Sequence, residues 1–252
     1  MWAPFVVAVL LLASIAGGVF LDSGLFARPV IAADPRAAGA RIALTFDDGP
    51  NPVYTEQILD LLDAGQHRAT FFVVGQRAES SPDLIAEISK RGHLVANHSF
   101  YHSNFTPFHS PARLAAELER TQSVIEKATG VRPRWFRPPI GLLSPRVVEA
   151  ARRCKLDLVG WTASARDGGR RPTVGRSFDR LRCHLHPGAI LVLHDSVLGG
   201  KQEPIAPALL ERLLLELDRR GLQSVTLDDL FPDQHCSSTA RIAGGNRARS
   251  IA

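Results

Sequence analysis

The sequence predicts an α/β fold, a distorted (β/α) barrel of about seven parallel strands that forms one domain over residues 41–231. Short apolar runs rich in β-branched residues alternate there with longer segments of helical periodicity. Polar side chains of the types used in catalysis come directly after several of these runs. The chain has 252 residues, 45% hydrophobic and 22% charged, which excludes collagen, a coiled coil and a wholly disordered chain.

Seven runs have the composition of strands. They cover residues 42–46, 70–74, 93–96, 135–137, 157–161, 190–193 and 223–226. Helical segments separate most of these runs, so neighbouring strands of the sheet are expected to be parallel.

Serine–proline pairs and glycines mark the expected helix ends. A serine N-cap precedes a proline at the first helical position at Ser81-Pro82, Ser110-Pro111 and Ser144-Pro145. Glycines placed for C-terminal caps are Gly65, Gly92, Gly130 and Gly221. Leucines at helical spacing between residues 209 and 217 are expected to face the core.

An uncharged run of 17 residues, 5–21, lies near the N-terminus. It is slightly shorter than the ~20 residues of a typical membrane span and slightly longer than a usual secretory core. Residues 1–32 are therefore predicted to be a signal peptide, cleaved before Ala33, or a membrane anchor with its linker. Residues 33–40 are predicted to be a linker, and residues 232–252 a polar, disordered tail.

The flanking charges leave the orientation of this leader open. An exported or membrane-anchored protein that faces the cell envelope is the favoured interpretation. However, no Lys or Arg precedes the run, whereas Arg28, Arg36 and Arg41 follow it. The positive-inside bias would place the following domain in the cytoplasm.

Charge and cysteine content exclude two further classes. The net charge is +5, but the arginines are scattered without a nucleic-acid-binding motif, so no nucleic-acid partner is predicted. Cys154, Cys183 and Cys236 cannot all pair and have no CxxC spacing, so they do not form a disulfide framework. We expect a monomer.

Titratable residues follow separate predicted strands. They are Asp47 and Asp48, His98 and His102, Arg137, Asp167, and His194 and Asp195. The carboxyl ends of parallel strands meet on one face of a barrel or open sheet, where active sites form. The sequence therefore predicts one site that contains these groups.

The pair Asp47-Asp48 precedes Gly49-Pro50, so two carboxylates lie at a sharp turn and project in different directions. One can bind a metal while the other faces the attacking water. The alternative is that Asp-Gly-Pro serves only as turn chemistry.

His98 and His102 are four residues apart, which would place both imidazoles on one side of a helical turn. With Asp48 they make a two-histidine, one-carboxylate set that leaves coordination positions open, as catalytic zinc sites do. Non-haem iron oxygenases use the same set, so that class stays open here.

His194 ends an apolar strand and can act as a general acid at neutral pH, unless it is a core histidine bonded to a carbonyl. His184 and His186 form a weaker candidate metal pair because no carboxylate is near them in sequence. His67, His109 and His235 are expected at the surface.

Several motifs resemble the polysaccharide deacetylase family, also called carbohydrate esterase family four. They are residues 45–50 (TFDDGP), 69–72 (ATFF), 92–93 (GH), 97–102 (NHSFYH), 137–139 (RPP) and 193–195 (LHD). The likeness covers residues 41–231 in the family's order. It implies a divalent metal, usually zinc with cobalt or another ion as alternatives, and removal of acetyl groups from N-acetylated sugars of a polysaccharide.

The resemblance also implies a role for each matching residue. Asp48, His98 and His102 would hold the metal, Asp47 would be the base, and His194 would be the acid. Arg137 would orient the base and Asp167 would partner the acid. The Ile140 N–H would stabilise the oxyanion, and Pro138 and Leu193 would contact the substrate, with Leu193 lining the acetyl pocket.

Three departures from the family pattern lie on the substrate side. Ile140 stands where the family often has tyrosine, Ser164 where it often has aspartate, and Gly168 where it often has a tryptophan that walls the sugar groove. Peptidoglycan or another envelope glycan is favoured over chitin. An O-deacetylase and a catalytically silent glycan-binding protein remain alternatives.

Overall fold

The structure is a computed structural model that describes residues 27–103, 109–169, 171–196 and 203–232. The predicted hydrophobic run at 5–21 lies outside these ranges, as does the predicted tail apart from Pro232. Within the described ranges, no helix has both the length and the apolar character that crossing a membrane requires.

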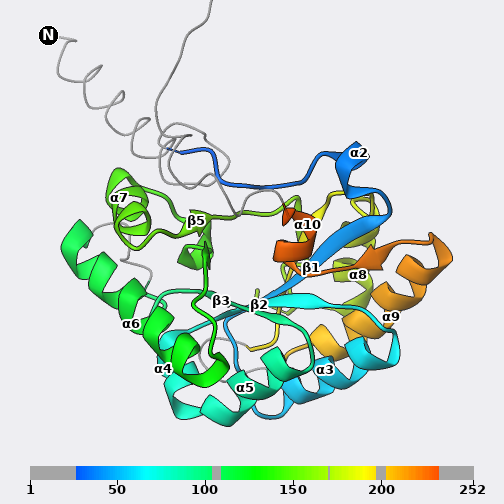
Figure 1. The fold of residues 1–252 in the computed structure, drawn as a ribbon. Helices are drawn as coiled ribbons and strands as arrows, with labels where there is room; N and C mark the ends of the chain where they lie inside the picture. The colour runs from blue at the N-terminus through cyan, green and yellow to red at the C-terminus, as the bar shows by residue number, and fades with distance from the viewer. Residues whose placement is uncertain (1–26, 104–108, 170, 197–202, 233–252) are drawn as a thin grey trace, which may run out of the picture.

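One parallel sheet lies at the centre of the molecule (Figure 1). Its strands are β1 (Arg41–Asp47), β2 (Ala69–Val73), β3 (Leu94–Asn97), β4 (Trp135–Phe136), β5 (Asp157–Leu158), β6 (Ala163–Ser164), β7 (Ile190–His194) and β8 (Gln223–Ser224). The order is β5-β4-β3-β2-β1-β7-β6, and β8 pairs with the start of β1. The prediction of about seven parallel strands in a distorted barrel is confirmed, as an open half-barrel. The β6 strand was not predicted, and the run at 223–226 forms only a two-residue strand.

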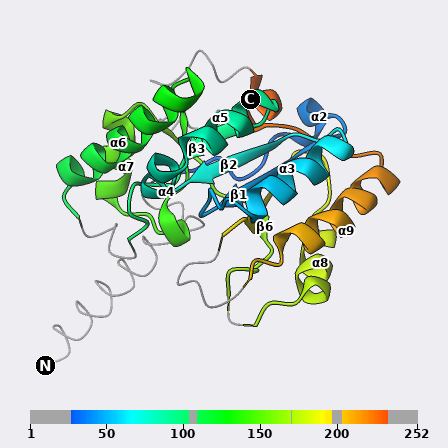
Figure 2. The same ribbon diagram turned by 90° about the horizontal axis from the view of Figure 1, so that it is seen from below.

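Helices cover the outer face of the sheet, as Figures 1 and 2 show together. They are α3 (Tyr54–Ala64), α4 (Gly75–Ser80), α5 (Pro82–Lys90), α6 (Pro111–Thr129), α7 (Pro145–Arg153), α8 (Val174–Arg182) and α9 (Ala206–Arg219). Along this layer α3 packs beside α9, α5 beside α6 and α8 beside α9. The predicted leucine stripe of α9 is buried from Leu209 to Leu217. The short helix α10 (Leu227–Leu230) packs with the inner side of the sheet.

Side-chain alternation along β1 separates two cores. Ile42, Leu44 and Phe46 belong to the cluster that packs against the helices. Ala43 belongs to an inner cluster that also holds Leu230 of α10. Because successive side chains of a strand point to opposite faces, Asp47 follows Ala43 on the inner face.

The predicted helix ends agree with the structure at most positions. The hydroxyls of Ser110 and Ser144 accept from backbone N–H groups at 3.3 Å, as N-caps do. Ser81 makes no such bond, although Pro82 does begin α5. Gly130 and Gly65 are the C-caps of α6 and α3, as predicted; Gly130 is left-handed with φ 75°, whereas Gly65 has a right-handed backbone.

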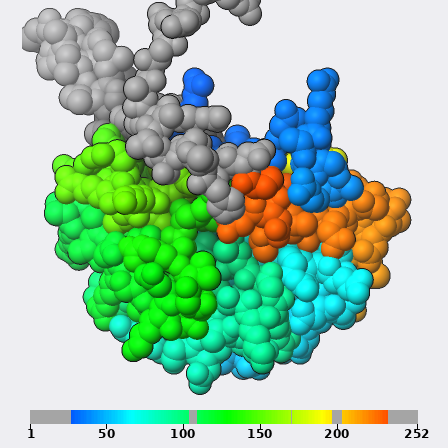
Figure 3. Space-filling view, in the orientation of Figure 1, coloured from blue at the N-terminus to red at the C-terminus, as the bar shows by residue number. Residues whose placement is uncertain are grey.

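The segment before β1 is more ordered than a linker. Helix α2 (Pro35–Ala38) begins at an Asp34 N-cap within the predicted linker 33–40, and Figure 3 shows it projecting beside the C-terminal elements. Val30 pairs with Val159, and Ala32 pairs with Ala189. Residues 30–33 therefore connect the end of β5 to the start of β7.

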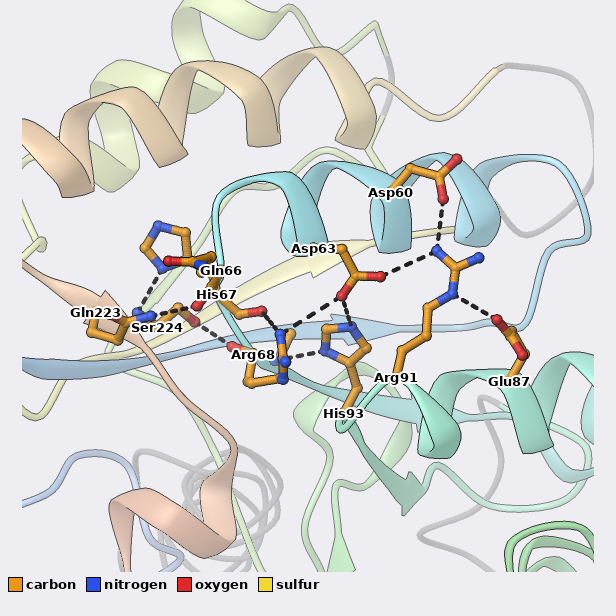
Figure 4. Close-up of polar contacts among 11 residues, drawn as sticks. Asp60, Asp63, Gln66, His67, Arg68, Glu87, Arg91, His93, Gln223 and Ser224 are labelled. Carbon is orange, nitrogen blue, oxygen red and sulfur yellow. Dashed lines mark hydrogen bonds and ion pairs between the residues drawn. The ribbon is translucent and has the colours of Figure 1, made fainter.

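Two buried histidines hold the amino ends of the strands (Figure 4). The Nδ1 atom of His93 accepts from the Ala69 N–H at 3.2 Å, and that of His67 accepts from the Ser224 N–H at 3.1 Å. His67 is only 1% exposed, so its predicted surface position was wrong. Both bonds need an unprotonated Nδ1, so each imidazole is neutral in the native fold.

We predict that this pair makes stability fall in mild acid. Burial lowers the pKa of His93 to about 4, although nearby Asp63 opposes the shift, and burial also lowers the pKa of His67. The unfolded chain binds these protons near pH 6.5, so the free energy of unfolding declines as pH falls from about 6.5 towards 4. His93→Gln, which keeps an acceptor but does not titrate, should reduce this decline by about 2 kcal/mol in urea denaturation.

His184→Gln, at an exposed site, is the matched control and should keep the wild-type pH dependence. If the free energy of unfolding falls equally with pH in wild type and in His93→Gln, protonation of His93 does not cause the decline.

Candidate functional site

The pairing of β1 with β7 brings two chemical groups side by side. Asp47 and His194 are register partners at the carboxyl ends of these neighbouring strands. Both side chains lie on the inner face of the sheet. In β7, Leu191 and Leu193 pack in the helix-facing cluster, so His194, at the alternate position, points to the inner face. A carboxylate and an imidazole therefore face the same end of the half-barrel.

Asp48, His98 and His102 meet next to this pair. Their ligand atoms all lie within 4.8 Å of one another. The Asp48 Oδ1 atom is 3.4 Å from His98 Nε2 and 3.1 Å from His102 Nε2. The sequence prediction that these three groups come together agrees with this arrangement.

The two histidines do not lie on a helical turn, so that detail was predicted wrongly. Ser99 and His102 have left-handed backbones, with φ 66° and 52°, which no α-helix accommodates. The Ser99 carbonyl accepts from the Gly75 N–H at the start of α4, at 2.9 Å, and the Asn97 side chain accepts from the Ser99 N–H at 2.9 Å. A loop bonded to α4 thus replaces the expected turn.

The donor set fits a divalent cation. His98 Nδ1 is 2.7 Å from the Arg137 carbonyl, so it donates there and leaves the Nε2 lone pair directed at Asp48. Asp48 Oδ1 is buried without a hydrogen-bond partner in the described structure. Burial raises the pKa of Asp48, but the contacts with His102 and His98 outweigh it and hold the pKa well below its usual range. One carboxylate oxygen and two imidazole nitrogens are typical ligands of a catalytic zinc site.

Arg137 holds Asp47 inside the half-barrel. Its fully buried guanidinium is 2.6 Å from Asp47 Oδ1 and also donates to Thr45 Oγ1 at 2.8 Å and the Gly160 carbonyl at 2.9 Å. The ring of Phe72 lies beneath it at 4.1 Å. The buried pair carries no net charge, and its bonds fix the direction of the Asp47 carboxylate.

His194 is bonded to Asp167 through two contacts. The Nδ1 atom is 2.7 Å from Asp167 Oδ1, and the backbone N–H donates to Oδ2 at 2.9 Å. Burial would lower the pKa of His194, but the bond to Asp167 and the charges of Asp167, Asp47 and Asp48 raise it to about 9. His194 therefore carries a proton at neutral pH.

The residues predicted to contact the substrate differ in exposure and in the face of the sheet on which they lie. Ile140 is 52% exposed, and its φ of 58° is a strained value for a β-branched residue. Pro138, two residues before it, is buried. Leu193 is fully buried in the helix-facing cluster, opposite His194, so its predicted position in the acetyl pocket disagrees with the structure. Val192 is the apolar residue of β7 that precedes His194 on the same face, and strand alternation could have identified it.

Thr55 and Arg77, which the sequence interpretation missed, help to hold the turn at Asp48. Thr55 Oγ1 donates to Asp195 Oδ2 at 2.5 Å, and a Cβ on Gly49 would collide with that carboxylate. Arg77 donates to the Asp48 carbonyl at 2.7 Å and also to Ser196. Burial raises the pKa of Asp195 to about 7, with a further contribution from Asp48. These bonds join the turn to the end of β7; only the position of Asp195 next to His194 could have indicated them.

Comparisons with known proteins agree with this fold. The model of the polysaccharide deacetylase family matches residues 35–159. A peptidoglycan-N-acetylglucosamine deacetylase of Bacillus cereus is 33% identical over 77% of this chain and 89% of its own length. A chitooligosaccharide deacetylase of Bradyrhizobium is 33% identical over 75% of this chain and 90% of its own. The chain belongs to the polysaccharide deacetylase family.

Solved structures share the fold. A family 4 acetyl xylan esterase of Clostridium thermocellum, in complex with a cobalt ion, has a TM-score of 0.70 and 32% identity and covers 79% of this chain and 93% of its own. A family 4 pseudoenzyme of Bacillus anthracis has a TM-score of 0.71 and 26% identity over 80% of this chain and 68% of its own. The family fold therefore occurs in both active and inactive proteins.

We predict that His98→Ala abolishes tight metal binding. Removing one of three ligands should weaken zinc affinity by more than the roughly 10–100-fold that follows loss of a residue bonded to a ligand. Metal content after dialysis, measured by elemental analysis, checks this. His186→Ala removes an exposed imidazole elsewhere and should retain the wild-type content; full occupancy in His98→Ala would remove His98 from the ligand set.

Proposed function

We propose that this protein is a metal-dependent hydrolase that removes acetyl groups from N-acetylated sugars of a cell-envelope polysaccharide. The observation that carries the proposal is the placement of Asp48, His98 and His102 beside Asp47 and His194 at one end of the half-barrel. A family of deacetylases uses this fold, and two of its members named above are a peptidoglycan-N-acetylglucosamine deacetylase and a chitooligosaccharide deacetylase.

The ligand set favours zinc, with cobalt as an alternative that a related esterase binds. Asp48, His98 and His102 would hold the cation. When bound, such a cation polarises the acetyl carbonyl and makes water acidic enough to ionise near neutral pH.

Asp47 acts as the general base in this proposal. Arg137 engages its Oδ1 atom, which keeps the carboxylate oriented and leaves Oδ2 to accept a proton from the attacking water. The Ile140 N–H is the proposed donor to the oxyanion, and its strained backbone is consistent with a fixed direction.

His194 acts as the general acid. Its raised pKa, about 9, keeps it protonated at neutral pH, and Asp167 fixes the imidazole so that Nε2 is free to donate. An amine is a poor leaving group unless it is protonated, whereas an alcohol leaves more easily. A protonated His194 that Asp167 holds in place therefore favours N-deacetylation over the O-deacetylase alternative.

The proposed substrate is a glycan of the envelope, peptidoglycan ahead of chitin, reached by an exported or membrane-anchored chain. The names of the relatives support the substrate, and the apolar run at 5–21 supports export.

Two other classes fit the observations less well. A silent binding protein, like the pseudoenzyme relative, would not require base, ligands and acid together, and this chain has all of them. An iron oxygenase could use the same three ligands, but Asp47 and His194 would then have no proton to transfer.

We predict that the purified chain loaded with zinc releases acetate from peptidoglycan or chitooligosaccharides, and that Asp47→Asn lowers kcat by about 10²–10⁴-fold. The asparagine cannot accept the proton but keeps the shape of the site. An enzymatic acetate assay measures this, with metal content and sugar binding as controls. Unchanged turnover in Asp47→Asn would reject the proposed base.

We also predict that Asp167→Asn shifts the alkaline limb of the kcat profile to lower pH. Asp167 raises the pKa of His194, so activity should be lost as pH rises through about 9 in the wild type and earlier in the variant. The pH profile of acetate release checks the sign. If Asp167→Asn is folded and has normal metal content, and the alkaline limb of its kcat profile does not move, His194 is not the acid.

A further inference from the structure

Helix α4 begins between the two segments that carry the predicted metal ligands. Just before the helix, the Val74 N–H donates to the Gly49 carbonyl, next to Asp48, at 2.8 Å. The following two N–H groups donate to carbonyls of the loop between the two histidine ligands, those of Ser99 and Phe100, at 2.9 and 3.0 Å. The first N–H groups of a helix have no partner inside the helix and can bind other segments. The start of α4 therefore joins the turn at Asp48 to the loop between the histidines.

The loop between the histidines lies directly against α4. A Cβ on Gly75 would be 2.5 Å from the Phe100 ring and 2.5 Å from Thr121 Oγ1 of α6. Atoms at these distances overlap, so glycine is required for this close approach. In addition, the Arg120 guanidinium lies 3.8 Å from the centroid of the Phe100 ring and contacts Glu79 of α4 at 2.9 Å. Backbone bonds and side-chain packing thus both fix the loop to α4.

Arg77, the third residue of α4, reaches the carboxylate ligand's backbone and the end of β7. Its Nη1 atom donates to the Asp48 carbonyl at 2.7 Å and also to the hydroxyl of Ser196, two residues after β7. In the described part of the chain, the hydrogen bonds of this guanidinium go to a carbonyl and a hydroxyl and to no carboxylate. Arg77 therefore links the turn at Asp48 and the end of β7 to the helix that also holds the loop between the histidines.

The backbone of Asp48 needs such support. Its φ is 75°, a left-handed value that residues other than glycine adopt rarely, although aspartate tolerates it better than most. A strained conformation of this kind persists only where the surrounding structure fixes it. The carbonyl that Arg77 binds belongs to Asp48 itself, so this bond helps to fix the direction in which the carboxylate leaves the backbone.

We propose that Arg77 is a positioning residue of the metal site. From α4 it holds the backbone of Asp48, and so the direction of the carboxylate, relative to His98 and His102, because the loop between these histidines is bonded to the start of the same helix. Residues that orient a ligand in this way tune metal affinity without touching the metal. This inference rests on the proposed function and extends its metal site by a residue outside the ligand set.

The charge of Arg77 and the bonds that it makes have opposite effects on cation binding. A positive group near the site repels a cation, so loss of the charge alone would strengthen zinc binding. Loss of the bonds would instead let Asp48 turn away from the two imidazoles and would weaken zinc binding. The sign of the change in zinc affinity therefore separates a positioning role from a purely electrostatic one.

The test measures the zinc affinity of the full chain, first stripped of metal, by competition with a fluorescent zinc chelator. Arg77→Met keeps an apolar stem but removes every donor, and it should weaken zinc binding by about 10–100-fold. The free energy of unfolding of the metal-free chain, measured in urea, shows separately how far the substitution affects the fold. Zinc binding by Arg77→Met that equals or exceeds that of the wild type overturns the inference.

Arg91→Met is the matched control. Arg91 contacts Asp60 and Asp63 of α3 and Glu87 of α5 (Figure 4), and none of these residues belongs to the site. Its substitution should lower the free energy of unfolding of the metal-free chain but leave zinc affinity unchanged. If both variants lose zinc affinity to the same extent, a general loss of stability explains the effect, and the inference is overturned.

A second variant keeps the inference testable if Arg77→Met does not fold. Ser196→Ala removes only one acceptor of the Arg77 guanidinium and leaves the bond to the Asp48 carbonyl. A several-fold loss of zinc affinity in Ser196→Ala supports the inference, and an unchanged affinity then overturns it.

The same measurements separate this inference from the proposed function. If the wild type binds zinc but releases no acetate from any glycan, the deacetylase proposal fails, while the zinc affinities of the variants still decide the role of Arg77. A wild-type chain that binds no zinc overturns both.

Discussion

The parallel, in-register alignment of β1 with β2 and β7 is the constraint on which the rest of the structure depends. It makes Asp47 the neighbour of His194 and places every second side chain of these strands on the inner face. A shift of β1 by one residue would turn Asp47 into the helix-facing core, away from Arg137 and His194. Arg137, which joins β4 to Asp47 and Thr45, keeps the charges of that inner face balanced.

The fold could largely be predicted because alternation of strands and helices is a strong local pattern. The central strands β1, β2 and β7 lie within one or two residues of their expected positions. The outer strands β4, β5 and β6 have only two residues each, so tertiary pairing defines them and their sequence carries little periodicity. The order in residues 30–38 was missed because its partners, such as Val159, lie far away in sequence.

The sequence predicted the site best where the type of residue decides its role, and worst where the direction of the side chain decides it. Asp48, His98 and His102 converge as spacing and strand ends indicated, yet the path between the histidines is a loop held by contacts with α4. Leu193 was assigned to the site from its place in a motif, although strand parity puts it on the other face. The contact between Asp195 and Thr55 joins residues 140 positions apart, which local spacing does not reveal.

The pairing of residues 30–33 has a consequence for proteolytic maturation. Val30 exchanges backbone bonds with Leu158 and Gly160 at 2.9 and 2.8 Å, and the Ile31 carbonyl accepts from Thr162 at 2.9 Å. A peptidase that cut before Ala33 would remove Val30 and Ile31. The backbone groups of Leu158 and Gly160 and the Thr162 hydroxyl would then lose these hydrogen-bond partners. A cut upstream of Val30 would preserve these bonds, so the position of any processing event determines whether the mature chain keeps this connection between β5 and β7.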